Sequence, residues 1–255
     1  MPKEMTKVKI AGFTDIGLRR KHNEDNIGFN QQLGIAVLAD GMGGHQAGEI
    51  ASKMAVNAVL EKLQDLCARK SSVSITSSQL LEFVSNTISH SNSIIYQAAE
   101  TIDEHKGMGT TLVAAVIKGS RIYAGHVGDS RLYLFRDRQL SRITRDHSLV
   151  QDLIDKGFYT EEEAKSASVG HIVTRALGTK AEVEVDTIAH DAQPGDVLLL
   201  CSDGLSDMVA DWQIEDTLAD SRLELEAAAK KLITLANRNG GKDNISVILM
   251  QLQQS

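Results

Sequence analysis

Short apolar runs bounded by glycine, aspartate or asparagine recur along this 255-residue chain. Runs of this length, rich in valine, leucine and isoleucine, are typical of buried strands. They predict strands at 8–13, 34–39, 110–117, 121–127, 132–135, 140–143, 197–202 and 245–251. At 182–187 valine and threonine alternate with acidic residues, which predicts a further, half-buried strand.

Apolar residues spaced at i, i+3, i+4 and i+7 predict three longer helices. The first covers 46–66 and the second 81–98. The third begins near Ser221 and Glu224, which have capping-box spacing, and ends at the glycines that follow Asn239. The Ser-rich segment 70–79 and the polar segment 17–26 are predicted to be loops.

The order of these elements predicts an α+β fold with antiparallel strands. Short turns such as Gly119-Ser120 join neighbouring strands, and strands and helices follow in separate runs. No internal repeat or long linker is visible, so we expect a single domain over 1–255. Within it, 146–178 is polar and has two short predicted helices, 148–156 and 160–166. We expect a flap beside the candidate site, with a plain surface excursion as the alternative.

Composition excludes some classes of partner. The formal net charge is −7, from 27 basic and 34 acidic residues. This argues against a nucleic-acid or anionic-membrane partner, both of which need a basic surface. No stretch approaches the ~20 apolar residues of a membrane span, and the start lacks an apolar leader, so the cytoplasm is the default location. Cys67 and Cys201 are expected to be reduced thiols, and without a heptad pattern we expect a monomer.

Four aspartates lie beside predicted strands. Asp40 closes one apolar run, Asp203 closes another, Asp129 follows a third and Asp243 precedes the last. Carboxylates delivered by strand ends can converge, and converging carboxylates need a counter-charge, which hard divalent cations with oxygen ligands supply. Each Asp-Gly pair could alone be only a turn, so four unrelated turns remain the alternative to a metal enzyme.

A charged loop adds a candidate phosphate-binding group. Arg20 stands close to Glu24 and Asp25. A guanidinium suits phosphate because it offers several donors in one plane and stays charged, while Glu24 and Asp25 could support a metal. The alternative is a solvated charge cluster. Glycine patterns of dinucleotide- and nucleotide-binding loops, the paired histidines of zinc hydrolases and the nucleophile elbow of serine hydrolases are absent from the sequence.

Taken together, the motifs resemble the protein phosphatase type 2C family, most closely its compact bacterial members. The resemblance spans nearly the whole chain in the family order. It implies a four-layer α-β-β-α sandwich, with two antiparallel sheets face to face and helices outside. The matching segments are Arg20–Asp25, Ala39–His45, Gly107–Thr111, His126–Arg131, Asp146–Ser148, Leu198–Gly204 and Gly240–Asn244.

The resemblance also implies a pair of Mn²⁺ or Mg²⁺ ions. Asp40 would bridge the two ions, and the carbonyl of Gly41 would bind one of them. Asp203 and Asp243 would bind the other. Asp129 matches the aspartate that, with Asp203, holds a third and weaker ion in bacterial members.

The same resemblance implies the reaction and the partners. Arg20 would bind phosphate, Glu24 would act through water and Asp25 would support the ligands from behind. A hydroxide that bridges the metals would attack phosphoserine or phosphothreonine directly, in proteins phosphorylated by a bacterial Ser/Thr kinase. Met42 stands where eukaryotic-type members carry a histidine, so no general acid is assigned. Alternatives are a regulator that binds phosphoproteins without turnover and a hydrolase of small phosphoesters.

Overall fold

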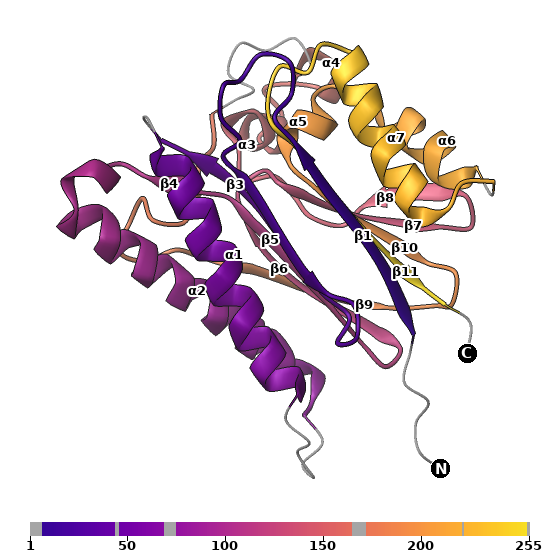
Figure 1. The fold of residues 1–255 in the computed structure, drawn as a ribbon, viewed down its shortest axis with the longest axis horizontal. Helices are drawn as coiled ribbons and strands as arrows, with labels where there is room; N and C mark the ends of the chain where they lie inside the picture. The colour runs from indigo at the N-terminus through magenta and orange to yellow at the C-terminus, as the bar shows by residue number, and fades with distance from the viewer. Residues whose placement is uncertain (1–6, 44–45, 69–74, 165–171, 221, 254–255) are drawn as a thin grey trace.

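Two antiparallel sheets lie face to face, with helices covering both outer faces (Figure 1). The structure, a computed structural model, describes residues 7–43, 46–68, 75–164, 172–220 and 222–253. Its strands are β1 (Val8–Asp15), β2 (Asp25–Asn30), β3 (Ile35–Met42), β4 (Gly109–Thr110), β5 (Leu112–Lys118), β6 (Arg121–Val127), β7 (Arg131–Arg136), β8 (Gln139–Arg142), β9 (Asp186–Asp191), β10 (Val197–Cys201) and β11 (Ile245–Leu252). Its helices are α1 (Ala47–Ala68), α2 (Ser77–Thr101), the 3-10 turn η1 (Asp103–His105), α3 (Leu149–Asp155), α4 (Glu161–Ala164), α5 (Asp203–Ser206), α6 (Asp211–Ala219) and α7 (Leu225–Arg238).

The sheets have different strand orders. One runs β1-β11-β10-β7-β8 and the other β2-β3-β5-β6-β9, with the short β4 paired to β3. Helices α1 and α2 pack on the second sheet, and α5, α6 and α7 pack on the first. The expected α+β sandwich of four layers is therefore confirmed.

Each central strand is buried on both faces, which explains its continuous apolar sequence. In β10, Leu198 and Leu200 point into the core between the sheets, while Leu199 and Cys201 point toward the helices. Successive side chains of a strand alternate between faces, so a strand between two cores needs apolar residues at both parities. Antiparallel sheets more often have one face exposed to solvent, but here helices cover the outer face of each sheet.

Several boundaries differ from the sequence-based expectations. Strand β2 begins inside the segment expected to be loop, and the short helices α5 and α6 were not predicted. The alternating pattern at 182–187 only partly forms a strand, since β9 begins at Asp186. The third long helix begins at Leu225, with Glu224 as its N-cap. The described residues do not include Ser221, Gly44, His45, 69–74 or residues 165–171 of the predicted flap.

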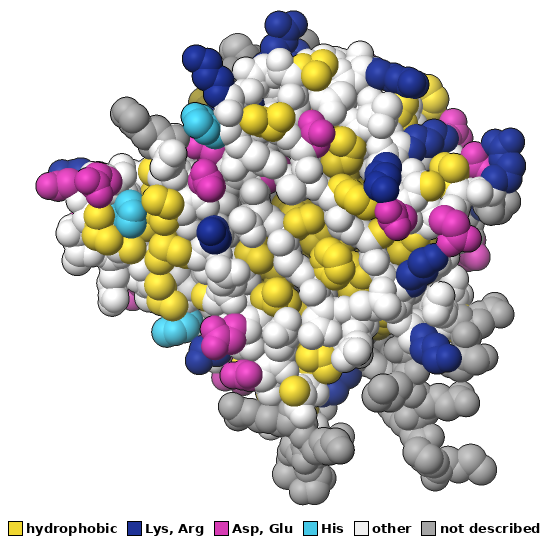
Figure 2. Space-filling model, viewed as in Figure 1, with side chains coloured by type: hydrophobic (Ala, Val, Ile, Leu, Met, Phe, Trp, Pro, Cys, Tyr) yellow, Lys and Arg dark blue, Asp and Glu magenta, His cyan; other side chains and the backbone are white. Residues whose placement is uncertain are grey.

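Charged side chains of both signs are mixed on the face seen in Figure 2, mostly around its rim. No single-sign patch is visible on that face, as expected from the modest negative charge. Within the part of the chain that the structure describes, no helix is both long and apolar enough to cross a bilayer.

Candidate metal and phosphate site

The structure brings the predicted aspartates together from separate elements. The register of β2 and β3 places Asp25 directly opposite Asp40. Asp40 lies within β3, two residues before its end, and not at a strand end as expected. Asp203 is the first residue of α5, two residues after the end of β10, and its negative charge raises the pKa of Asp40.

Asp129 and Asp243 complete the cluster. Asp129 follows β6 and Asp243 precedes β11. The charge of Asp203 raises the pKa of Asp129, and the charge of Asp243 raises that of Asp203. Arg20 also reaches this cluster, because its Nη2 donates to Asp243 Oδ2 over 2.6 Å. Its side chain remains half exposed, so it can still turn toward a bound anion. The loop residue and the metal ligands expected from the motifs therefore lie in one place.

Burial of like charges raises the pKa values of these carboxyls. Desolvation is the main cause in each case, and neighbouring carboxylates add to it. The pKa of Asp25 rises to about 7, that of Asp129 to about 7 and that of Asp203 to about 6. The pKa of Asp40 lies well above its ordinary value for the same reasons. The protein groups around the cluster thus do not compensate the negative charge of its carboxylates.

The backbone around Asp40 is held by two adjacent threonines. The carbonyl of Asp40 accepts from Thr111 N over 2.8 Å and from Thr110 Oγ1 over 2.8 Å. The amide of Asp40 donates to Thr111 Oγ1 over 3.1 Å, and that hydroxyl contacts Ser130 Oγ at 2.7 Å. The two threonines belong to a matching motif, but sequence reasoning gave them no role. Their contribution depends on the pairing of β4 with β3.

Asp25 is buried behind the other carboxyls. Its Oδ2 accepts from Ser202 Oγ over 2.8 Å, and Ser202 Oγ in turn accepts from Ser246 N over 3.0 Å. The Ser202 side chain, just after β10, therefore links Asp25 on β2 to the backbone of Ser246 on β11. Ser202 flanks Asp203, but nothing in its local sequence indicates this partner 177 residues away.

Two glycines permit backbone contacts that no side chain would allow. A Cβ on Gly41 would lie 2.1 Å from the carbonyl oxygen of Gly48 in the first turn of α1. A Cβ on Gly204 would lie 1.9 Å from the carbonyl oxygen of Asn244. Glycine is required at both positions because elements that carry site residues approach each other closely there. This gives the Asp-Gly pairs a structural reason beyond a turn.

The donor set fits hard divalent cations. The buried oxygens Asp203 Oδ1 and Asp25 Oδ1 have no hydrogen-bond partner among the described residues. Buried polar atoms are normally paired, so unpaired carboxylate oxygens in a cluster are suited to bind a cation. All candidate ligand atoms are oxygens, the donors that Mg²⁺ and Mn²⁺ prefer.

Comparison with known proteins shows the family of this chain. The protein phosphatase 2C family profile matches residues 19–248. The chain belongs to the protein phosphatase 2C family. It is 41% identical over 241 residues to the serine/threonine phosphatase stp of Listeria monocytogenes, which covers 93% of each chain.

Solved structures of 2C phosphatases agree in fold. The Mycobacterium tuberculosis serine/threonine phosphatase PstP superposes with a TM-score of 0.86 at 39% identity, covering 97% of this chain and 99% of that chain. A structure of the PstP catalytic domain in complex with two manganese ions gives a TM-score of 0.85 at 38% identity, covering 97% and 99%. The family resemblance stated from the motifs is thus confirmed.

A second cluster of possible ligands in this 2C phosphatase is better explained without metal. One atom each from His126, His147 and Asp186 lies within 4.8 Å of the others. The amide of Gly128 donates to His147 Nδ1 over 3.1 Å, so the proton of the neutral ring sits on Nε2. Nε2 therefore lacks a free lone pair, and Arg175 Nη1, 3.3 Å away, adds a positive charge. The cluster is an internal network in which His147 and Arg175 face Asp186.

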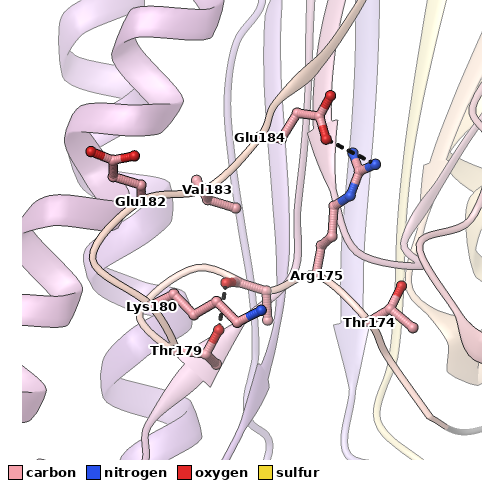
Figure 3. Close-up of a pocket in the computed structure, with 8 residues that line it drawn as sticks. Thr174, Arg175, Thr179, Lys180, Glu182, Val183 and Glu184 are labelled. Carbon is pink, nitrogen blue, oxygen red and sulfur yellow. Dashed lines mark hydrogen bonds and ion pairs between the residues drawn. The ribbon is translucent and has the colours of Figure 1, made fainter.

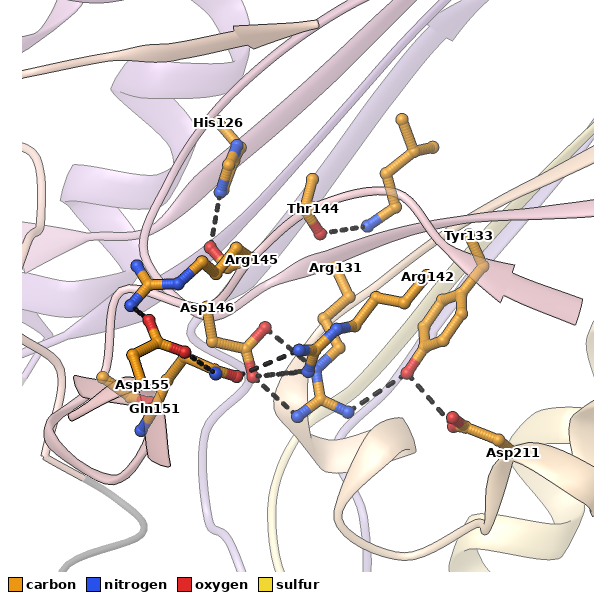
Figure 4. A network of polar contacts seen from close by, with 12 residues as sticks. His126, Arg131, Tyr133, Arg142, Thr144, Arg145, Asp146, Gln151, Asp155 and Asp211 are labelled. Atoms are coloured by element: carbon orange, nitrogen blue, oxygen red, sulfur yellow. Dashed lines mark hydrogen bonds and ion pairs between the residues drawn. The ribbon is translucent and has the colours of Figure 1, made fainter. Parts of the chain in front are cut away.

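The start of the predicted flap is tied to the sheet by charged contacts. Arg131 on β7 binds both oxygens of Asp146 through Nε at 3.1 and 3.0 Å, and through Nη2 at 2.6 Å (Figure 4). The Nη1 of Arg131 also donates to the hydroxyl of Tyr133, which donates to Asp211. Since Arg131 lies two residues after Asp129, this network orders the chain on that side of the carboxylates.

A hollow of about 190 Å³ lies between the end of the predicted flap and the segment that leads to β9 (Figure 3). Arg175 and Glu184 form an ion pair at its wall, with Nη2 and Oε2 separated by 3.1 Å. None of the eight predicted site residues lines this hollow. It is therefore separate from the carboxylate site.

Proposed function

We propose that this chain hydrolyses phosphoserine and phosphothreonine in proteins at the carboxylate cluster, with Mn²⁺ or Mg²⁺ bound there. Asp40, the Gly41 carbonyl, Asp203 and Asp243 would hold two ions, and Asp129 with Asp203 a third. The observation that supports this most strongly is the convergence of five aspartates. Four of them, Asp25, Asp40, Asp129 and Asp203, have raised pKa values, and Asp25 and Asp203 each have an unpaired buried oxygen.

The residues around the ions have distinct proposed roles. When bound, the ions supply Lewis acidity and an activated water. Arg20 binds the phosphoryl oxygens and stabilises their negative charge in the transition state. The carboxyl of Glu24 lies against the first turn of α1, where it would help to hold the ions through water. Asp25 holds the cluster from behind through its bond with Ser202.

No serine, cysteine or histidine nucleophile is needed, because water attacks phosphorus directly. Ser202 is committed to Asp25, and Cys201 is buried with a pKa raised to about 12 by desolvation. Met42 pairs with Gly109 in the β3–β4 register, at the position of the histidine in eukaryotic-type members. The proton donor to the leaving group therefore stays unassigned.

Turnover with defined metals tests the proposal. Purified protein is assayed on p-nitrophenyl phosphate and on a phosphothreonine peptide after chelation, with Mg²⁺ and with Mn²⁺, beside Asp40→Asn. Mutation of residues behind metal ligands commonly costs about 10- to 100-fold, so we expect loss of at least about 100-fold for this ligand. Calorimetric titration with Mn²⁺ measures metal binding independently of turnover.

The outcomes separate the alternatives. Metal-dependent turnover of both substrates, lost in Asp40→Asn, supports the phosphatase. Turnover of p-nitrophenyl phosphate alone would favour a hydrolase of small phosphoesters. Folded protein that binds phosphopeptide without turnover under any metal would favour a regulator. Five further points stay predictions: a kinase partner, the monomeric state, the cytoplasmic location, a single domain over 1–255 and a flap at 146–178.

A further inference from the structure

The loop that carries Arg20 is held mainly by polar contacts. This segment, residues 16–24, joins β1 to β2 and is the indigo loop beyond the end of β1 in Figure 1. Its apolar residues Ile16 and Leu18 are 39% and 65% exposed. Little hydrophobic burial therefore fixes the loop, and the position of Arg20 must depend on hydrogen bonds to its backbone.

One buried side chain makes three of these bonds. Asn244, only 4% exposed, donates through Nδ2 to the carbonyl of Ile16 over 3.0 Å and to that of His22 over 2.9 Å. Its Oδ1 accepts from the amide of Glu24 over 2.8 Å. Both donor hydrogens and the acceptor oxygen of the carboxamide thus form hydrogen bonds with the loop. These bonds connect the part of the loop before Arg20 to the part after it.

Asn244 is itself well anchored beside the metal site. Its backbone amide donates to Asp243 Oδ1 over 2.8 Å, while Arg20 Nη2 donates to Asp243 Oδ2. Its carbonyl lies against Gly204, where no Cβ would fit. The backbone of Asn244 thus contacts Asp243, whereas the side chain of Asn244 forms its hydrogen bonds with the loop. Changing the side chain should disturb the loop while the contact to Asp243 remains.

We propose that Asn244 is a positioning residue for phosphate binding, because its carboxamide sets the loop that presents Arg20. The inference rests on the proposed function, in which Arg20 binds the phosphoryl group. A purely structural role is the competing account. It predicts lower stability with no specific loss of phosphate affinity.

The chain offers a matched control in Asn92. This residue is 1% exposed, and its Nδ2 donates to the carbonyls of Lys180 and Ala181 over 3.0 and 3.1 Å. Its Oδ1 accepts from the amide of Gly178 over 2.8 Å. Asn92→Ala therefore removes the same three kinds of bond from a different loop. It should lower stability about as much as Asn244→Ala.

The experiment compares wild type, Asn244→Ala, Asn92→Ala, Arg20→Ala and the double variant Arg20→Ala/Asn244→Ala. The dissociation constant of inorganic phosphate is measured by calorimetry with saturating Mn²⁺, alongside KM and kcat for p-nitrophenyl phosphate. We expect Asn244→Ala to weaken phosphate binding and raise KM on the order of tenfold, as for loss of a few hydrogen bonds. Mn²⁺ affinity and kcat should change by less than about threefold, and Asn92→Ala should leave phosphate affinity unchanged.

The double variant decides whether Asn244 acts through Arg20. If it does, Asn244→Ala should cause little further loss of phosphate affinity when Arg20 is already replaced by alanine. The same loss in both backgrounds, or an equal loss in Asn92→Ala, would overturn the proposal. Should Asn244→Ala not fold, Asn244→Ser is judged by the same criteria. If wild type lacks turnover, the proposed function fails, whereas hydrogen exchange at the Glu24 amide still tests the loop contact. Unchanged exchange in the metal-free variant would refute it.

Discussion

Asp25 should make the metal-free protein less stable as pH rises. Its carboxyl is buried, and burial beside Asp203 and Asp243 raises its pKa from 3.8 to about 7. The folded state therefore holds this proton more tightly than the unfolded chain does. The contribution to stability is fully present below about pH 4 and is lost as pH rises through about 7.

The magnitude follows from the size of the shift. At about 1.36 kcal/mol per pKa unit, a shift of about three units corresponds to about 4 kcal/mol at pH 8. Asp25→Asn removes the ionisation, and the amide can still accept the hydrogen bond from Ser202. We expect the metal-free variant to match wild type near pH 4 and to be more stable by up to about 4 kcal/mol at pH 8.

Urea unfolding of metal-free protein between pH 4 and 8 measures this difference. Asp103→Asn, an exposed aspartate outside the carboxylate cluster, is the control for loss of one surface charge. Added Mn²⁺ should stabilise wild type by about 2.7 kcal/mol at one hundred times its dissociation constant. This reduces the difference in unfolding free energy between Asp25→Asn and wild type. A gap between Asp25→Asn and wild type that stays constant from pH 4 to 8 would refute the reasoning.

Three further predictions concern other parts of the site. Arg20→Ala should raise KM for p-nitrophenyl phosphate more than it lowers kcat, and steady-state kinetics showing only a lower kcat would confine Arg20 to the transition state. Gly204→Ala should lower the unfolding free energy by about 2 kcal/mol, measured by urea unfolding, because its Cβ would meet the Asn244 carbonyl at 1.9 Å. Exchange of 146–178 with that of a relative should alter preference among phosphopeptides, and unchanged preference would favour a surface excursion over a flap.

Local pattern was enough to predict most of the elements. The apolar run at 197–202 became β10, and the spacing over 46–66 became most of α1, because burial of each segment depends on its own period. The candidate carboxylates could be named from the sequence as well. Each stands beside an apolar strand, and several such motifs in one order carried the family resemblance.

The pairing of strands that are distant in the sequence could not be predicted from local pattern. Strand β2 has a polar start, and it is a strand because Asp25 pairs with Asp40 across the sheet. At 182–187 the alternation predicted a strand, but only the part that finds β6 as a partner forms one. A strand needs a neighbour, and a neighbour is a property of the tertiary structure.

The sequence by itself determined which residues are candidates for the chemistry, since motif, charge and apolar pattern are properties of short segments. Only the tertiary structure decided how they act together. It placed Arg20 on Asp243, buried Asp25 behind the other carboxyls and made Asn244 the residue that fixes the loop. These contacts join residues about 180 to 220 positions apart, and burial between the sheets strengthens those of Asp25 and Asn244.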